Sequence, residues 1–140
     1  MMTPHEISLI KKSWSIFRDI EPSIVADVFY TRLFVENPEL RRMFPSRMDE
    51  QYKKLIEMLN IVVARLERMD ELTGDIAAMA RRHKDYGVRA EHYNMVGRAL
   101  LWTLQRGLNG EWTQEVKSAW ISCYATLSGT MISATKESDN

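Results

Sequence analysis

The chain has 140 residues, a length that suits one domain with a hydrophobic core of its own. Its 19 Lys and Arg residues balance 19 Asp and Glu residues, which argues against nucleic acid or an anionic membrane as the main partner. The one cysteine excludes a disulfide framework and a cysteine-based zinc site, and it favours a reducing compartment. We find neither a run of ~18 apolar residues nor a signal peptide. We therefore expect a single cytoplasmic domain over residues 1–140, with no membrane span, as a monomer or weak homodimer.

Two helices are predicted in the first third of the chain. The first helix has Thr3 as its N-cap and Pro4 as its first residue, and it reaches Phe17. Glu6 is the capping-box partner of Thr3. A second helix begins at Pro22. Its apolar side is formed by Val25, Val28, Phe29 and Leu33.

A short helical turn and a long helix follow. Asn37 and Pro38 form another cap-and-proline pair, and Pro45 ends the short turn. From about Asp49, apolar residues recur at a spacing of 3.6 residues as far as Met69. This stripe predicts one continuous helix over that range.

Three further helices are predicted in the second half. Gly74 marks a break before a helix over residues 76–84, and Gly87 is well placed just past the end of that helix. Apolar residues from Tyr93 to Leu108 mark the next helix, and Thr113 caps the last one, whose stripe includes Trp120, Cys123 and Leu127. Period-two alternation is absent from the sequence. The predicted class is all-α, with about seven helices and short connections.

The stretch RRHKDYGV, residues 81–88, places a histidine near a predicted helix end. Because a helix C-terminus favours positive charge, His83 can be interpreted as a capping imidazolium. The alternative is a neutral imidazole that is available to bind a metal. His5 falls in a first helical turn and His92 on the helix face away from Tyr93, so we expect both of these histidines at the surface.

A family resemblance bears on this choice. The stretches FYTRLFVENPELRRMF, RRHKDYGVRAEHYNMVGRALL and SAWISCYATL, together with Gln51, resemble those of bacterial single-domain globins and of the haem domain of flavohaemoglobins. The resemblance covers nearly the whole chain. It implies a globin fold, a three-over-three helical sandwich around one haem b.

The resemblance also implies roles for particular residues. His83 would be the metal ligand, a neutral imidazole whose other ring nitrogen donates to a backbone carbonyl or a side chain, and the helix end supplies unpaired carbonyls for such a bond. Tyr30 and Gln51 would be the catalytic pair that points at the ligand, and the alternatives are a core tyrosine and an exposed helix residue. Lys54 would pair with a haem propionate, and Arg82 either does the same or is a solvated charge. The full implied haem contacts are Phe44, Lys54, Leu55, Arg82, His83, Tyr86, Val88, Tyr93 and Val96.

The chain departs from the flavohaemoglobin pattern on the proximal side. Tyr93 matches a tyrosine that helps to orient the proximal histidine together with a glutamate of the last helix. The equivalent position here is Thr135, with Glu137 two residues on. This difference weakens the expectation of a strongly imidazolate-like His83, and with it the case for efficient NO dioxygenation.

Three functions are compatible with these residues. The first is tight binding of O2, NO or CO that supports NO detoxification to nitrate. Because we find no flavin- or nicotinamide-binding domain in these 140 residues, we expect an external reductase as electron donor for this function. The second is an O2 or NO carrier, or a sensor that acts through a partner protein. The third is a helical domain without haem, against which His83 and Phe44 argue. Whether the chain is an enzyme stays open at this point.

Overall fold

The computed structural model describes residues 2–138, and the side chains of residues 2–136. Met1 and residues 139–140 of the expected domain therefore lie outside the described residues. Within the described range the chain is helical, without strands. The elements in chain order are α1 (Pro4–Phe17), α2 (Pro22–Glu36), η1 (Pro38–Met43), α3 (Asp49–Ala64), η2 (Leu66–Leu72), α4 (Thr73–Asp85), α5 (Ala90–Leu108), η3 (Asn109–Glu111) and α6 (Gln114–Ser138), where η denotes a 3₁₀-helix.

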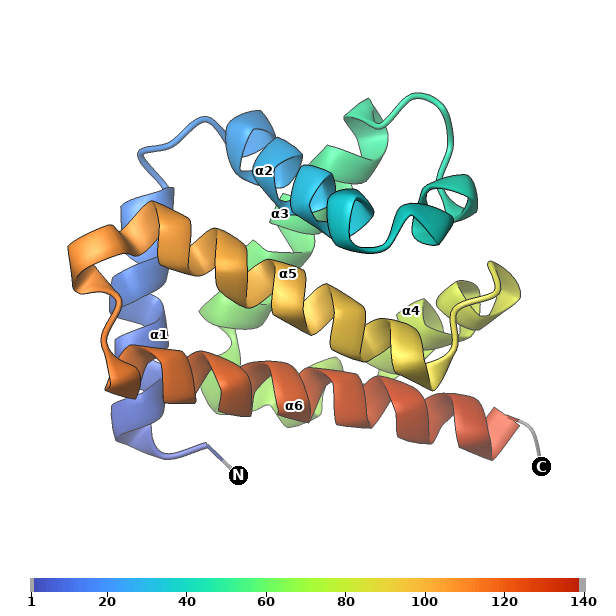
Figure 1. Cartoon of the computed structure of the whole chain (residues 1–140). Helices are drawn as coiled ribbons and strands as arrows, with labels where there is room; N and C mark the ends of the chain where they lie inside the picture. Colours follow the sequence, from blue (N-terminus) through green and yellow to red (C-terminus); the bar gives the residue numbers. More distant parts are fainter. Residues whose placement is uncertain (1, 139–140) are drawn as a thin grey trace.

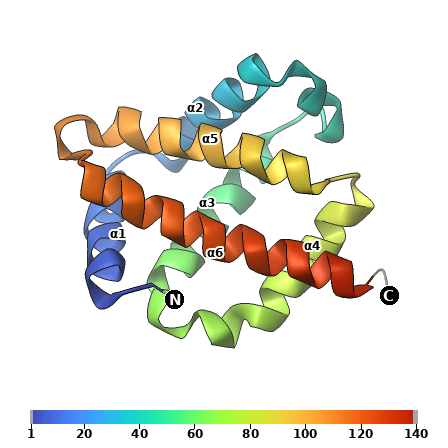
Figure 2. The same ribbon diagram turned by 60° about the horizontal axis from the view of Figure 1, so that its bottom comes forward.

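The six α-helices of residues 2–138 form two layers (Figure 1). Helices α2, α5 and α6 make one layer, and α1, α3 and α4 make the other. Contacts of α4 and α1 with α6, and of α3 with α2, join the layers. Figure 2 shows α6 passing in front of α3 and running on toward α4. This arrangement is the predicted three-over-three sandwich.

The helix starts follow the local sequence signals. Thr3 and Glu6 form the predicted capping box, in which each side chain accepts a bond from the other residue's backbone N–H. Thr113 caps α6 by accepting a bond from the N–H of Val116 at 3.2 Å. Pro22 occupies the first turn of α2. The first N–H groups of a helix have no intrahelical partner. Capping side chains, and proline, which has no N–H, are therefore favoured at helix starts.

Two predictions about the middle of the chain are wrong. Helix α3 ends at Ala64, and the apolar stripe continues through the 3₁₀-helix η2, where Arg68 has non-helical dihedrals of φ −132° and ψ 37°. Gly74 lies inside the first turn of α4, so the expected break falls before it. The stripe identifies the apolar residues correctly, but it does not show that the chain must turn to bring α4 against α6.

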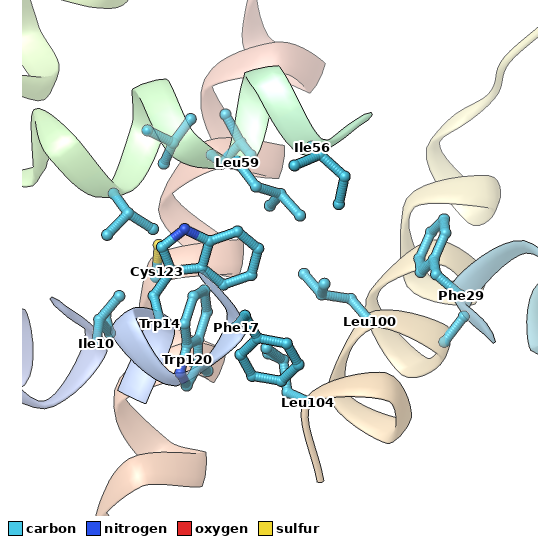
Figure 3. Close-up of a cluster of buried hydrophobic side chains, with 14 of the residues drawn as sticks. Ile10, Trp14, Phe17, Phe29, Ile56, Leu59, Leu100, Leu104, Trp120 and Cys123 are labelled. Carbon is cyan, nitrogen blue, oxygen red and sulfur yellow. The ribbon is translucent and has the colours of Figure 1, made fainter. Parts of the chain in front are cut away.

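The core between α1 and α6 is built around two tryptophans (Figure 3). The rings of Trp14 and Trp120 have centroids 6.0 Å apart. Trp120 Nε1 donates to Ser13 Oγ at 3.0 Å, and Ser13 Oγ donates onward to the carbonyl of Leu9 at 2.8 Å. Trp14 Nε1 donates to Asn60 Oδ1 of α3 at 2.8 Å. Both indole N–H groups therefore have partners, as buried polar groups require.

Cys123 is a buried member of this core, as the sequence predicts. Burial raises the pKa of its thiol to about 12. The thiol is therefore protonated and behaves as a small apolar group.

None of the helices in the described part of the chain is long and apolar enough to cross a lipid bilayer.

Candidate functional site

A hydrogen bond joins Tyr30 and Gln51, the two residues that the sequence predicts to point at a ligand. Tyr30 lies on α2 and is only 4% exposed, and Gln51 lies in the first turn of α3. Gln51 Nε2 donates to the Tyr30 hydroxyl oxygen at 3.2 Å. Among the described residues the Tyr30 hydroxyl accepts this bond and donates none. Its proton is therefore available to a ligand.

Aromatic rings surround Tyr30. Its ring stacks on Tyr52 with centroids 5.5 Å apart and an interplanar angle of 10°, and it lies at a wider angle against Phe34. Phe29 and Phe44 meet it edge-on, with centroids at 4.9 Å and 5.5 Å. Such stacked and edge-to-face pairs are the favoured aromatic geometries. They fix the phenol ring from α2, α3 and the end of η1.

The environment keeps the Tyr30 phenol protonated. Burial raises the pKa of Tyr30 to about 12, the Gln51 bond lowers that pKa, and Tyr52 raises it again. Desolvation disfavours the phenolate because a charge is costly in a medium of low dielectric constant. Tyr30 is therefore a hydrogen-bond donor throughout the physiological pH range.

His83 is held in one orientation on α4. It is half-buried, and its Nδ1 lies 2.8 Å from the carbonyl oxygen of Met79, one turn earlier. This contact assigns the proton to Nδ1 and leaves the lone pair on Nε2. Burial lowers the pKa of His83, the Met79 bond opposes this, and the charge of Arg82 lowers the pKa further. The imidazole is therefore neutral at pH 7.

The acceptor is a backbone carbonyl, one of the two expected kinds, but it does not lie at the helix end. The bond from His83 goes to a carbonyl inside the helix, because the i−4 carbonyl of Met79 lies directly beneath the ring. The carbonyls at the helix end are used differently. Val88 N–H donates to the His83 carbonyl at 3.0 Å, and Gly87 N–H donates to that of Lys84 at 2.9 Å. Gly87 has φ +90°, the left-handed conformation that glycine adopts without strain past a helix end.

Helices α5 and α6 support the proximal side. The Tyr124 hydroxyl donates to the carbonyl of Tyr93 at 2.6 Å. Gly97 allows this close approach, since a Cβ there would lie 2.8 Å from the Tyr124 ring. Thr135 donates to the carbonyl of Ile132 in its own helix at 2.8 Å. The side chain of Glu137 lies outside the described residues.

Half-buried apolar side chains gather on the elements that carry Gln51 and His83. Each packs against the core on one side and keeps part of its surface exposed on the other. Helices α3 and α4 both pack on the opposite layer and do not pack closely on each other along their lengths. These half-buried side chains include Phe44 just past η1, Leu55 of α3, Met79 of α4, and Tyr93 and Val96 of α5.

The charged candidates lie on the surface. Lys54 and Arg82 are exposed, and Tyr86 is 67% exposed at the end of α4. The other two histidines have structural partners. Exposed His5 pairs with Glu115 at 3.4 Å, and His92 Nδ1, half-buried where a surface position was expected, accepts the backbone N–H of Arg89 at 2.9 Å.

The described residues contain no group of three or more His, Cys, Asp or Glu side chains placed to hold a metal ion. A metal held by His83 would need its other ligands from elsewhere. In haem the porphyrin supplies them, and one axial histidine suffices. The donor set and the half-buried apolar faces together fit a haem.

Sequence reasoning missed three residues around Tyr30. Tyr52 counts only as part of an apolar stripe in the sequence, yet its hydroxyl donates to Asp27 of α2 at 2.8 Å. Arg41 donates to the carbonyls of the two residues after Phe44. The distances are 2.9 Å to the Pro45 oxygen and 3.2 Å to the Ser46 oxygen. No spacing signal pairs Asp27 with Tyr52, because they lie 25 residues apart.

Comparisons with known proteins bear on the fold and the family. Residues 27–131 match the Globin family. A flavohemoprotein of Vibrio cholerae is 28% identical over 135 residues, which cover 94% of this chain but only 34% of that protein. The chain thus spans about one third of the length of the flavohemoproteins it matches. A globin-like protein of Aquifex aeolicus that is named as uncharacterised is 31% identical over 138 residues, 98% of this chain and 96% of that one.

A solved structure shares the fold. The bacterial globin of Campylobacter jejuni superimposes with a TM-score of 0.85. It is 24% identical in sequence, and the match covers 99% of this chain and 100% of that one.

Replacing Tyr124 by Phe tests the support on the proximal side. The variant removes the side-chain hydrogen bond from the Tyr124 hydroxyl to the Tyr93 carbonyl, so we expect the free energy of unfolding to fall by about 0.5–1.5 kcal/mol. Denaturant titration measures this loss. Tyr86→Phe is the matched control, because its exposed hydroxyl should matter by no more than about 0.5 kcal/mol. Equal effects of the two variants would contradict the assignment.

Proposed function

The chain belongs to the globin family, and from that premise we propose that it binds one haem b with His83 as the axial ligand and holds O2 tightly under Tyr30 and Gln51. The observation that carries this proposal is the direction of the distal hydrogen bond. Gln51 donates to Tyr30, so the buried phenol keeps its own proton for a ligand.

On the proximal side, the tautomer of His83 suits the role of ligand. With its proton on Nδ1 and directed to Met79, the ring presents an unprotonated Nε2. The lowered pKa keeps protons from competing for that nitrogen at pH 7. We propose that Phe44, Leu55, Val88, Tyr93 and Val96 cover the macrocycle, and that Lys54, Arg82 and Tyr86 contact its edge.

Haem supplies the site at which O2 binds and shifts electron density onto the ligand. The chain's own contribution is two hydrogen-bond donors, the Tyr30 hydroxyl and the Gln51 amide, which are oriented toward that charge before the ligand binds. A hydrogen bond to a charged group contributes about 1.5–3 kcal/mol, so each donor slows ligand release by about 10–150-fold. Such a pocket retains O2 rather than delivering it.

Retained O2 favours NO detoxification over transport. The reaction combines one NO with one O2 and takes up one electron to give nitrate. An electron donor must restore that electron after each turnover, and we propose a separate reductase. The name of the flavohemoprotein relatives, which pairs a flavin with a haem, supports such a partnership.

A carrier or sensor that acts through a partner protein is the second candidate. Carriage and sensing need a pocket that binds the same ligand through nearly the same residues, so kinetics rather than pocket geometry separates the two candidates. Slow release of O2 without a reaction with NO would favour this second candidate.

The role of His83 can be tested by cavity complementation. We expect the wild-type chain to bind haem one-to-one, and His83→Gly to lose the absorption spectrum of histidine-ligated haem. Free imidazole should restore it, because it occupies the space left by the ring. His5→Gln, a change at an exposed histidine, is the control and should bind haem normally. An unchanged spectrum in His83→Gly would exclude His83 as the ligand.

Tyr30→Phe tests the distal donor. The variant keeps the ring contacts and removes the hydroxyl, so O2 should leave the reduced protein about 10–150-fold faster than from wild type. Rapid mixing of the O2-loaded protein with a CO solution measures this rate. Equal and fast rates in both proteins would show that Tyr30 does not face the ligand.

Mixing the O2-loaded protein with NO in a stopped-flow instrument separates NO detoxification from carriage or sensing. We expect the O2-loaded spectrum to disappear rapidly and nitrate to form in equal amount. A slow reaction, or one that yields no nitrate, would count against the detoxification proposal and in favour of the second candidate.

A further inference from the structure

We propose that Tyr52 and Asp27, here termed the Asp27–Tyr52 brace, are positioning residues. They keep the side chains of Gln51 and Tyr30 in place to bond the ligand. The inference rests on the proposed function, since it assigns the brace to that distal pair. Neither residue is among the haem contacts expected from the sequence.

The brace and the distal pair are two parallel links between the same helices. Gln51 and Tyr52 are consecutive on α3, and their partners Tyr30 and Asp27 lie three residues apart, about one turn, on α2. The inner link is the 3.2 Å bond between Gln51 and Tyr30. The outer link is the 2.8 Å bond from the Tyr52 hydroxyl to Asp27 Oδ1. Together they define both the separation and the register of α2 and α3 at this point.

The start of α3 needs such an anchor. Its N-cap residue is Met48, whose side chain makes no capping bond. Gln51 occupies the third helical position, where a glutamine in a capping box would turn back to the N-cap N–H. Here its amide donates to Tyr30 instead. The residues just before the helix, Pro45 to Arg47, are exposed. The first turn therefore depends on side-chain bonds to α2.

Tyr52 acts on Tyr30 through its ring as well. The two rings are nearly parallel, at 10°, with centroids 5.5 Å apart. Because Tyr52 is half-buried between this stack and Asp27, its position determines where the Tyr30 ring face lies. Partial burial and the Asp27 carboxylate both raise the pKa of Tyr52, so its hydroxyl remains a donor.

The test separates the bond from the stack. Tyr52→Phe keeps the ring and removes the donor, Asp27→Ala removes the acceptor, and Asp27→Asn keeps an acceptor oxygen. We expect the first two variants to release O2 about threefold faster than wild type, and the double variant no faster than either, because both break one bond. Asp27→Asn should stay close to wild type.

A second readout does not depend on haem. The N–H of Tyr52 donates to the Met48 carbonyl at 2.8 Å, so its hydrogen exchange reports on the first turn of α3. We expect faster exchange of this backbone N–H in both Asp27→Ala and Tyr52→Phe, in protein with and without haem. The control is Glu67→Ala, which breaks an exposed bond between Lys11 of α1 and η2 and should change neither readout.

The outcomes distinguish this inference from the proposed function. If Tyr30→Phe releases O2 faster but the brace variants change neither release nor exchange, the inference is overturned and the proposed function stands. If Tyr30→Phe has no effect, the proposed function fails, and the brace has no distal pair to position. Equal effects of Glu67→Ala and Asp27→Ala would also overturn the inference, because a general loss of stability would then suffice.

Discussion

The structure depends on the separation of α3 and α4. Each of these helices packs on the opposite layer, α3 on α2 and α4 on α6, and the 3₁₀-helix η2 connects them. Apolar side chains on both helices, among them Leu55 and Met79, are only half-buried. Half-buried apolar surfaces of this kind can bind an apolar group, because covering them removes apolar area from water. The globin fold explains what that group is.

The direction of one hydrogen bond determines how the pair of Tyr30 and Gln51 is arranged. Tyr30 accepts from Gln51, so the phenol is positioned without using its own proton. Four aromatic rings prevent it from turning away, and burial keeps it protonated. His83 follows the same pattern: its Nδ1 bonds the Met79 carbonyl, and its Nε2 has no hydrogen-bond partner among the described residues. In each case one hydrogen bond, from Gln51 to Tyr30 or from His83 to Met79, fixes the orientation of a side chain and leaves its other polar atom available to a ligand.

Local signals in the sequence predicted the helix boundaries well where the physical cause is itself local. Thr3 and Thr113 cap helices because their hydroxyls reach N–H groups three residues away. Gly87 ends α4 because its backbone needs no distant partner to adopt φ +90°. The end of α3 at Ala64 was missed because no glycine or proline marks it, and the turn serves packing between layers.

The sequence by itself determined the all-α class, most of the helix starts and the residue types of the site, since these follow from apolar spacing and short-range hydrogen bonding. It also singled out Tyr30, Gln51 and His83 as residues to examine. Only the tertiary structure decided which atoms meet: that Gln51 donates to Tyr30, and that Tyr52 reaches Asp27. These contacts join helices far apart in the chain, and their geometry depends on how the layers pack, which no local pattern encodes.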